Sequence, residues 1–193
     1  MRTRLFARFG ALAFALALSG ALPLAGCSQQ RAPRQECPEI PEGLPVTELE
    51  MSYLAMLRAS HKSADIWEDR GDLEKALSEI KEALSVERAP GLPSEEAYLD
   101  AAGRAGQLLL KLKRPDDALA LAESAAKTAS GDTFYLAALK MVEGEAREAR
   151  AALQREKDPE AATREDAAAL DAYEASQAIN RRVLEALKTG RGQ

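Results

Sequence analysis

Residues 57–90, LRASHKSADIWEDRGDLEKALSEIKEALSVERAP, have the composition of two helices with one break between them. Strong helix formers such as Ala, Leu, Glu and Lys fill both halves. Gly71-Asp72 interrupts them, because glycine commonly ends a helix and aspartate caps the next one. Residues 99–132, LDAAGRAGQLLLKLKRPDDALALAESAAKTASGD, have the same length of 34 residues and a break at Arg114-Pro115. Each stretch therefore predicts a helical hairpin.

The same composition continues from Thr47 to the C-terminal end, and no stretch alternates β-branched with polar residues. We therefore expect an all-α fold of six helices in three antiparallel hairpins. Thr47 and Glu50 have the spacing of a capping box, which predicts the first helix start. Residues 88–93 are expected to end the second helix, and Ser94 to cap the third. The later predicted boundaries are Ser130-Gly131-Asp132, Asp158-Pro159 and a last helix end near Lys188.

The two stretches resemble the tetratricopeptide repeat, which has small residues at positions 8, 20 and 27, a large apolar one at 11 and glycine at 15. The matching residues are Ala64, Trp67, Gly71, Ala76 and Ala83 in the first stretch, and Gly106, Leu109, Lys113, Ala118 and Ala125 in the second. Lys113 departs from the glycine, and neither stretch has the usual proline at position 32. The resemblance implies a short array of stacked hairpins with Trp67 in its core. An ordinary helical bundle is the alternative.

Residues 132–189 fit the repeat poorly and predict a long C-terminal hairpin that caps the array. Its first helix has an apolar seam with coiled-coil spacing, and its last helix has a matching stripe. The seam consists of Tyr135, Leu139, Val142, Ala146, Ala149 and Leu153, and the stripe of Ala169, Ala172, Ser176, Ile179, Val183 and Ala186. We expect the seam and the stripe to pack against each other.

The chain begins with the layout of a secretory signal: arginines at positions 2, 4 and 8, then a charge-free run over residues 9–26. Leu24-Ala25-Gly26-Cys27 resembles the lipobox of bacterial lipoproteins. That resemblance implies cleavage before Cys27 and attachment of lipid to Cys27. Ser28 follows where an aspartate would imply retention in the inner membrane, so we expect an outer-membrane anchor facing the periplasm. A plain secreted protein and an uncleaved anchor are the alternatives.

The predicted organisation has four parts: a signal peptide at 1–26, a lipidated Cys27 with a proline-rich tether at 27–46, two hairpins at 47–131 and a long hairpin at 132–189. The tether contains four prolines, which favour extended backbone. We expect it to hold the helical part away from the membrane. Cys37 has no intramolecular partner once Cys27 carries lipid, so it is either unpaired or forms an intermolecular disulfide.

Charge and motif content argue against several functions. Residues 1–26 carry three of the 26 basic residues and none of the 31 acidic ones, which gives residues 27–193 a net charge of −8. This balance argues against nucleic acid as a partner. His61 is the single histidine, and the carboxylates alternate with Lys and Arg at helical spacing, as on solvated helices. We therefore expect neither an enzyme nor a metal or cofactor site.

In tetratricopeptide arrays the first helix of each hairpin lines a concave groove. The equivalent residues here are Arg58, His61, Asp65, Glu68 and Asp69, then Asp100, Gly103, Gln107, Leu110 and Lys111. We expect a protein partner to bind at His61, Asp65, Asp69, Gln107, Leu110 and Lys111. Their alternative role is that of ordinary surface residues.

Two functions follow from these observations. The first is a lipid-anchored adaptor or scaffold for a protein partner in a cell-envelope assembly of the outer-membrane, pilus, secretion or motility type. The second is a structural lipoprotein that self-associates through its C-terminal hairpin, and a homo-oligomer therefore stays open. An exposed apolar stripe along residues 169–187 would favour the second function.

Overall fold

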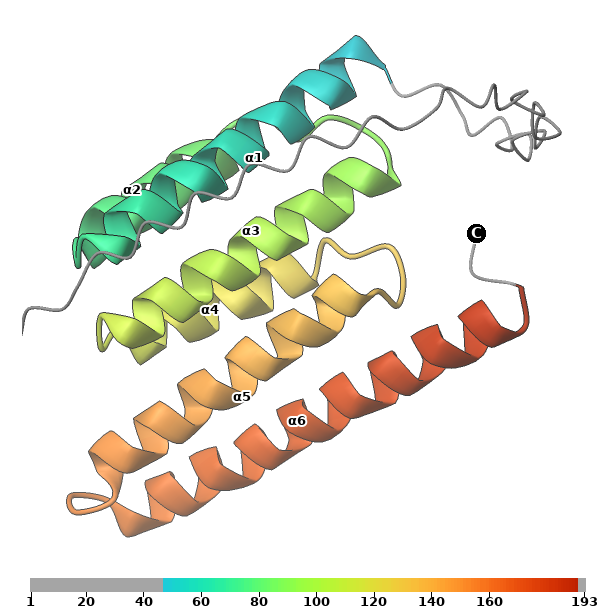
Figure 1. Cartoon of the computed structure of the whole chain (residues 1–193). Coiled ribbons are helices and arrows are strands. Elements are labelled where there is room, and N and C mark those ends of the chain that lie inside the picture. Colours follow the sequence, from blue (N-terminus) through green and yellow to red (C-terminus); the bar gives the residue numbers. More distant parts are fainter. Residues whose placement is uncertain (1–46, 191–193) are drawn as a thin grey trace, which may run out of the picture. The chain divides into compact units, whose positions relative to one another are not determined.

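The computed structural model describes residues 47–190, which belong to one compact unit, and within them it contains six α-helices (Figure 1). These are α1 (Glu48–Asp69), α2 (Leu73–Leu84), α3 (Leu92–Lys111), α4 (Pro115–Ala126), α5 (Phe134–Gln154) and α6 (Pro159–Lys188). The predicted all-α fold is confirmed. The signal peptide, Cys27, Cys37 and the tether lie outside the described residues. Within the described part, none of the helices combines the length and the apolar character needed to span a bilayer.

Three predicted helix starts are confirmed by their side-chain caps. The Thr47 hydroxyl accepts a hydrogen bond from the Glu50 amide at 3.1 Å, and the Asp72 carboxylate accepts one from the Lys75 amide at 3.2 Å. Asp158 accepts one from the amide of Ala161 at 2.9 Å. Each cap satisfies an amide that has no partner within its helix.

One predicted cap is wrong, and one helix begins just beyond its predicted boundary. Gly91, with a φ of 111°, precedes α3, and Ser94 lies fully buried inside that helix. Pro93 explains the shift, because proline fits the first turn of a helix and does not end it. The helix α5 begins just beyond the predicted boundary Ser130-Gly131-Asp132, and Thr133 caps it with its hydroxyl accepting from the Leu136 amide at 3.1 Å.

Two helices end earlier than predicted. The α2 helix stops at Leu84 rather than at residues 88–93, and α4 stops at Ala126 rather than at Ser130. A hydroxyl lies just beyond each end: Ser85 donates to the carbonyl of Glu82 at 2.7 Å, and Thr128 donates to that of Ala125 at 2.9 Å. These bonds satisfy carbonyls of the last turn before the chain reaches its prolines and glycines.

The turns of the first two hairpins share one backbone geometry. At the end of α1, the amides of Gly71 and Asp72 donate to the carbonyls of Glu68 and Trp67, both at 2.9 Å. At the end of α3, the amides of Lys113 and Arg114 make the equivalent bonds. Gly71 has a φ of 78° and Lys113 a φ of 61°. Lys113 therefore takes the left-handed conformation that glycine holds in the first turn.

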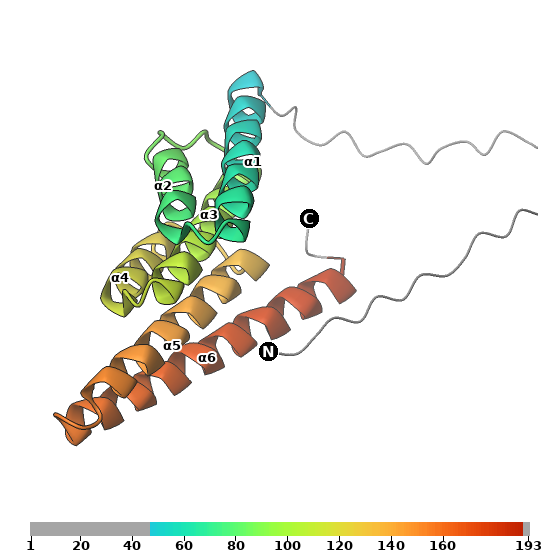
Figure 2. The same cartoon turned by 60° about the vertical axis from the view of Figure 1, so that its left-hand side comes forward.

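Each hairpin packs against the next one (Figures 1 and 2). The first helices α1, α3 and α5 contact one another in sequence, and α2 and α4 fill the space behind them. The predicted small residues Ala64, Ala76, Ala83, Ala118 and Ala125 are all buried. Whether the stack is a true tetratricopeptide array stays a prediction.

Trp67 is only half-buried, so its predicted place in the core is wrong in part. It packs against the core cluster formed by the first two hairpins. Its ring is also covered by cations, with Lys75 Nζ at 4.4 Å and the Arg70 guanidinium carbon at 5.1 Å from the ring centroid. Trp67 lies in the last turn of α1, which is open to solvent. The side chains of Arg70 and Lys75 therefore cover the part of its ring that the core does not contact.

The α5 seam does not face α6, so the predicted pairing is wrong on that side. Leu139 and Val142 pack with α3 and α4 in a second core cluster. They can do so because α3 carries Gly103 and Gly106, and a Cβ on Gly106 would lie 2.6 Å from Val142 Cγ1. Leu153, at the far end of the predicted seam, is 66% exposed.

A different face of α5 meets α6. The Ser176 hydroxyl of α6 donates to the Ala137 carbonyl at 2.8 Å, and the Tyr173 ring lies against Gly144. On α6 the predicted stripe is buried at Ala169, Ala172, Ser176 and Ile179, and half-buried at Val183 and Ala186. The stripe is therefore confirmed over most of its length, but the face of α5 that meets α6 is the one with Ala137 and Gly144.

Candidate functional site

Two adjoining pockets lie along the first helices of the hairpins. The first, the α3–α5 pocket, has a volume of about 210 Å³ and combines residues of α1, α3 and α5. Leu99, Gly103, Ala138 and Val142 give it apolar walls, and its polar groups are His61, Asp100, Arg104 and Gln107. The second, the α1–α3 pocket, has a volume of about 300 Å³. His61 and Asp100 line both pockets, so the two pockets adjoin at these side chains, and we call the pair the trough.

The local sequence explains why this trough is open. Gly103 has no side chain, and a Cβ there would touch only Leu139 Cδ2, at 4.0 Å. Because the neighbouring Asp100 and Gln107 lie one turn before and after it on α3, the polar groups surround a shallow depression. Both Asp100 and Gln107 are exposed.

Next to the trough, an ion cluster joins α1 to α3. Arg104 donates to Asp65 Oδ1 at 2.9 Å and also binds Glu68, which in turn binds Lys111. The hydrogen bond from Lys111 lowers the pKa of Glu68, although partial burial acts in the opposite direction. Lys62 lies 3.5 Å from the second Asp65 oxygen. This cluster holds the first hairpin on the second one.

The structure brings two of the predicted partner-binding residues, His61 and Gln107, to the α3–α5 pocket. Asp65 and Lys111 lie beside it, but their charges are used within the ion cluster. Leu110 was predicted to face the groove, but it is half-buried and packs against both core clusters.

Asp69 is exposed at the end of α1 and lines neither of the two pockets. Its position in the repeat placed it on the groove face, but the last turn of α1 lies beyond the trough.

Sequence reasoning missed Arg104 and the α5 wall of the trough. Arg104 is four residues after Asp100, so its helical spacing gave a usable signal. Ala138 and Val142 gave none, because the third hairpin had no repeat register. Tyr135, also on α5, has its pKa raised by burial, by Asp100 and by Glu96. In the described part of the chain, neither of these two carboxylates takes part in an ion pair.

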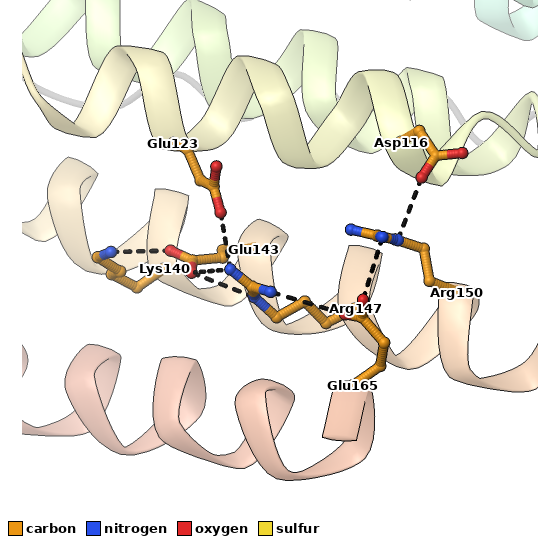
Figure 3. Close-up of polar contacts among 7 residues, drawn as sticks. All are labelled: Asp116, Glu123, Lys140, Glu143, Arg147, Arg150 and Glu165. Carbon is orange, nitrogen blue, oxygen red and sulfur yellow. Dashed lines mark hydrogen bonds and ion pairs between the residues drawn. The ribbon is translucent and has the colours of Figure 1, made fainter. Parts of the chain in front are cut away.

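A second ion network lies away from the trough, where α4, α5 and α6 meet (Figure 3). Arg147 reaches Glu123 at 2.7 Å, Glu143 at 3.2 Å and Glu165 at 3.6 Å. Arg150 reaches Asp116 and Glu165, both at 3.1 Å. The pairs to Glu143 and Glu165 are shielded, and those to Glu165 join α5 to α6 within the third hairpin, whereas Asp116 and Glu123 of α4 are more exposed and add little to the contact with the second hairpin.

Within residues 47–190, no cluster of three or more His, Cys, Asp or Glu side chains is arranged to hold a metal ion. Comparison of the chain with protein-family models, with curated proteins and with solved structures finds no match.

Proposed function

We propose that this protein is a lipid-anchored adaptor of the bacterial cell envelope. Its anchor lies in the outer membrane, and its helical unit faces the periplasm. In this proposal Cys27 carries the lipid, residues 28–46 form the tether and the helical unit binds a segment of a partner protein. The order of signal, lipobox, proline-rich tether and helical unit along the chain supports the anchored arrangement.

The observation that carries the binding role is the trough, the pair of adjoining pockets along α1, α3 and α5. Its two pockets are about 210 and 300 Å³, so each is suited to one or two side chains rather than to a large cofactor. An extended peptide or an amphipathic helix presents side chains in such a spaced series. The mixed polar and apolar lining suits a peptide that offers both kinds of group.

The alternative, self-association through the C-terminal hairpin, has less support. It needs an apolar stripe left free along residues 169–187. Ala169, Ala172, Ser176 and Ile179 are instead buried within the same chain, and the leucines that α6 leaves exposed are Leu170, Leu184 and Leu187. The adaptor is therefore our preferred function.

Site-specific photo-crosslinking in cells tests the binding role. A photoreactive residue at His61 or at Gln107 should capture the same partner, because both side chains line the α3–α5 pocket. The matched controls are Glu82 on α2 and Ser124 on α4, which are exposed on the second helices. Capture from the second helices alone, or only from α6, would contradict the proposal.

Charge reversal gives a second test. Asp65 is a poor choice because its ion pairs join two hairpins. Asp100 is exposed and lines both pockets, so Asp100→Lys should weaken capture while changing the stability by no more than about 0.5 kcal/mol. Unchanged capture by Asp100→Lys would argue against the trough as the binding surface.

The anchor is tested separately by metabolic labelling with a fatty-acid analogue. The chain should become labelled, and Cys27→Ser should abolish both labelling and membrane retention. Labelling that persists in Cys27→Ser would show that the lipid is attached elsewhere.

A further inference from the structure

Exposed apolar side chains gather at one edge of the helical unit. At this edge the helices α1, α3 and α5 begin and α6 ends (Figure 1). Six large apolar side chains in these terminal turns, each 54–64% exposed, form what we call the apolar edge. They are Leu49, Met51, Leu92, Phe134, Leu184 and Leu187.

Three contacts link neighbouring helix termini along this edge: two are polar, and one is a packing contact of Glu50 Oε1, which has no hydrogen-bond partner among the described residues. The Glu50 carboxylate of α1 lies against Gly91, where a Cβ would approach Oε1 to 2.5 Å. Glu95 of α3 accepts hydrogen bonds from the amide and hydroxyl of Ser130, at 2.6 and 2.9 Å. Arg182 of α6 forms a bidentate pair with Asp132, just before α5. The helix termini that carry the apolar side chains are therefore linked in series along this edge.

The opposite edge has a different composition. The turns there are densely charged, with five charged residues among the seven at 69–75, five of seven at 111–117 and five of six at 155–160. The loops of the apolar edge carry two charges in the ten residues 85–94 and two in the eight residues 127–134. The opposite edge does include Ile66 and Leu153 as exposed apolar residues. The loops of the apolar edge are thus the less charged, although the last turns of α6 add Arg181, Arg182, Glu185 and Lys188 at that edge.

The chain also enters the helical unit at the apolar edge, because Thr47 caps α1 there. Cys27 precedes Thr47 by 20 residues, a length that permits close approach as well as clearance. We infer that the apolar edge rests on the lipid bilayer to which the chain is anchored, with its leucines and Phe134 at the headgroup boundary. This inference rests on the proposed lipid anchor.

This contact would orient the trough. Because α1, α3 and α5 all begin at the apolar edge, their axes would rise from the membrane side, and the charged turns would face the aqueous space. Apolar side chains contribute to such binding in proportion to the area they bury in the interface. The partner would then reach the trough from the side rather than from the membrane.

Depth-dependent fluorescence quenching tests the inference. Single cysteines at Phe134, Leu187, Leu153 or Leu170 are placed in the full chain with Cys37→Ser and labelled with an environment-sensitive dye. The protein is reconstituted in vesicles of phosphatidylethanolamine and phosphatidylglycerol with brominated acyl chains. An apolar face lies about 5–10 Å into the interface, so labels at Phe134 and Leu187 should be quenched about twofold or more relative to the other two.

A paired substitution supplies the matched control. Leu92→Glu with Leu187→Glu should abolish quenching of a label at Phe134, whereas Leu153→Glu with Leu170→Glu should leave it unchanged. All four substituted leucines are exposed, so both variants should keep the thermal midpoint of the parent. Persistence of the quenching in the first pair would overturn the inference.

Intact mass measured on the same samples separates the two proposals. Acyl mass on Cys27 without selective quenching at Phe134 and Leu187 would leave the anchor in place and overturn the membrane contact. Absence of acyl mass would contradict the anchor, and the quenching profile would still decide the role of the edge. If sedimentation shows a dimer and the labels at Phe134 and Leu187 are not quenched by brominated lipid, the edge would instead bind a second copy of the chain.

Discussion

The first two hairpins and the third one begin with similar helices but are closed in different ways. The first helices α1, α3 and α5 have 22, 20 and 21 residues, whereas the second helices α2, α4 and α6 have 12, 12 and 30. Large side chains such as Leu77, Ile80 and Leu119 anchor α2 and α4 in the core. On α6 the buried residues are mostly alanines.

The difference shows that helix length can replace side-chain size. A helix of 12 residues has about three turns, so a few large residues must supply its contact area. The 30 residues of α6 spread many small contacts over eight turns or so. Small residues also let the backbones approach closely, which makes the hairpin sensitive to added volume.

The largest expected effect tests the division between the two faces of α5. Leu139→Ala should lower the free energy of unfolding by about 2–5 kcal/mol, because Leu139 is fully buried against α3 and α4. Urea denaturation followed by circular dichroism measures this. The control is Leu170→Ala on α6, where the side chain is 63% exposed and the change should be under about 0.5 kcal/mol. Equal losses from both variants would contradict the described orientation of α5.

A smaller loss is expected from added volume in the third hairpin. Gly144→Val should destabilise the protein by about 1–3 kcal/mol, because even a Cβ at this position would overlap the Tyr173 ring. Gly131→Val is the control, since nothing lies within 4 Å of a Cβ there. Adding Tyr173→Ala to Gly144→Val should make the two effects non-additive. Simple additivity would mean that the ring does not cover Gly144.

A gain in stability is expected in the second hairpin. Lys113 holds a φ of 61°, a conformation that costs a side-chain-bearing residue about 1–2 kcal/mol. Lys113→Gly should therefore raise the free energy of unfolding by up to about 1 kcal/mol after the added freedom of the unfolded chain is subtracted. The reciprocal change Gly71→Lys should lower it by a similar amount. A stabilising Gly71→Lys would show that the two turns are not equivalent.

The pH dependence of the third hairpin should reveal Tyr173. Burial, together with the hydrogen bond that its hydroxyl donates to Glu148 at 2.9 Å, raises the pKa of Tyr173 from 10.0 to about 12. The folded chain thus holds this proton more tightly than the unfolded chain. The resulting stability is complete below pH 10 and is lost as the pH rises toward 12.

Thermal melts across this alkaline range measure the effect. Tyr173→Phe removes the titrating group, so its stability should fall less steeply above pH 10 than that of the parent. Tyr135→Phe serves as the comparison in the same range, since the pKa of Tyr135 is also raised. A parent and a Tyr173→Phe variant with the same alkaline slope would contradict the assigned contact with Glu148.

Local signals in the sequence determined the all-α class and most helix boundaries. Asp72, Pro115 and Asp158 mark helix starts because caps and first-turn prolines act within one turn of chain. The alanines expected at close helix crossings are buried for the same local reason, since their spacing places them on one helix face. The lipobox-like residues ending at Cys27 are also a local signal in the sequence. They lie outside the described residues, so the lipid anchor stays a prediction.

The candidate site could be predicted only in part from the sequence. His61 and Gln107 line the trough as expected, but Asp65 and Lys111 are used in ion pairs and Leu110 turns toward the core. Repeat spacing gives the face on which a side chain lies. Repeat spacing does not show whether a neighbouring helix supplies a partner for that side chain. Arg104 of the second hairpin, for example, pairs with Asp65 of the first.

Only the tertiary structure decided which neighbour each face of α5 meets. The helix carries two low-polarity faces, one with Leu139 and Val142 and one with Ala137 and Gly144. Hydrophobic periodicity gives most weight to the larger side chains. The prediction from sequence therefore paired the face with Leu139 and Val142 with α6. The glycines at 103 and 106 of α3 leave room for those larger side chains, and the alanines of α6 fit the smaller face. Complementarity of volume between helices far apart in sequence therefore set the arrangement, because close packing depends on both surfaces at once.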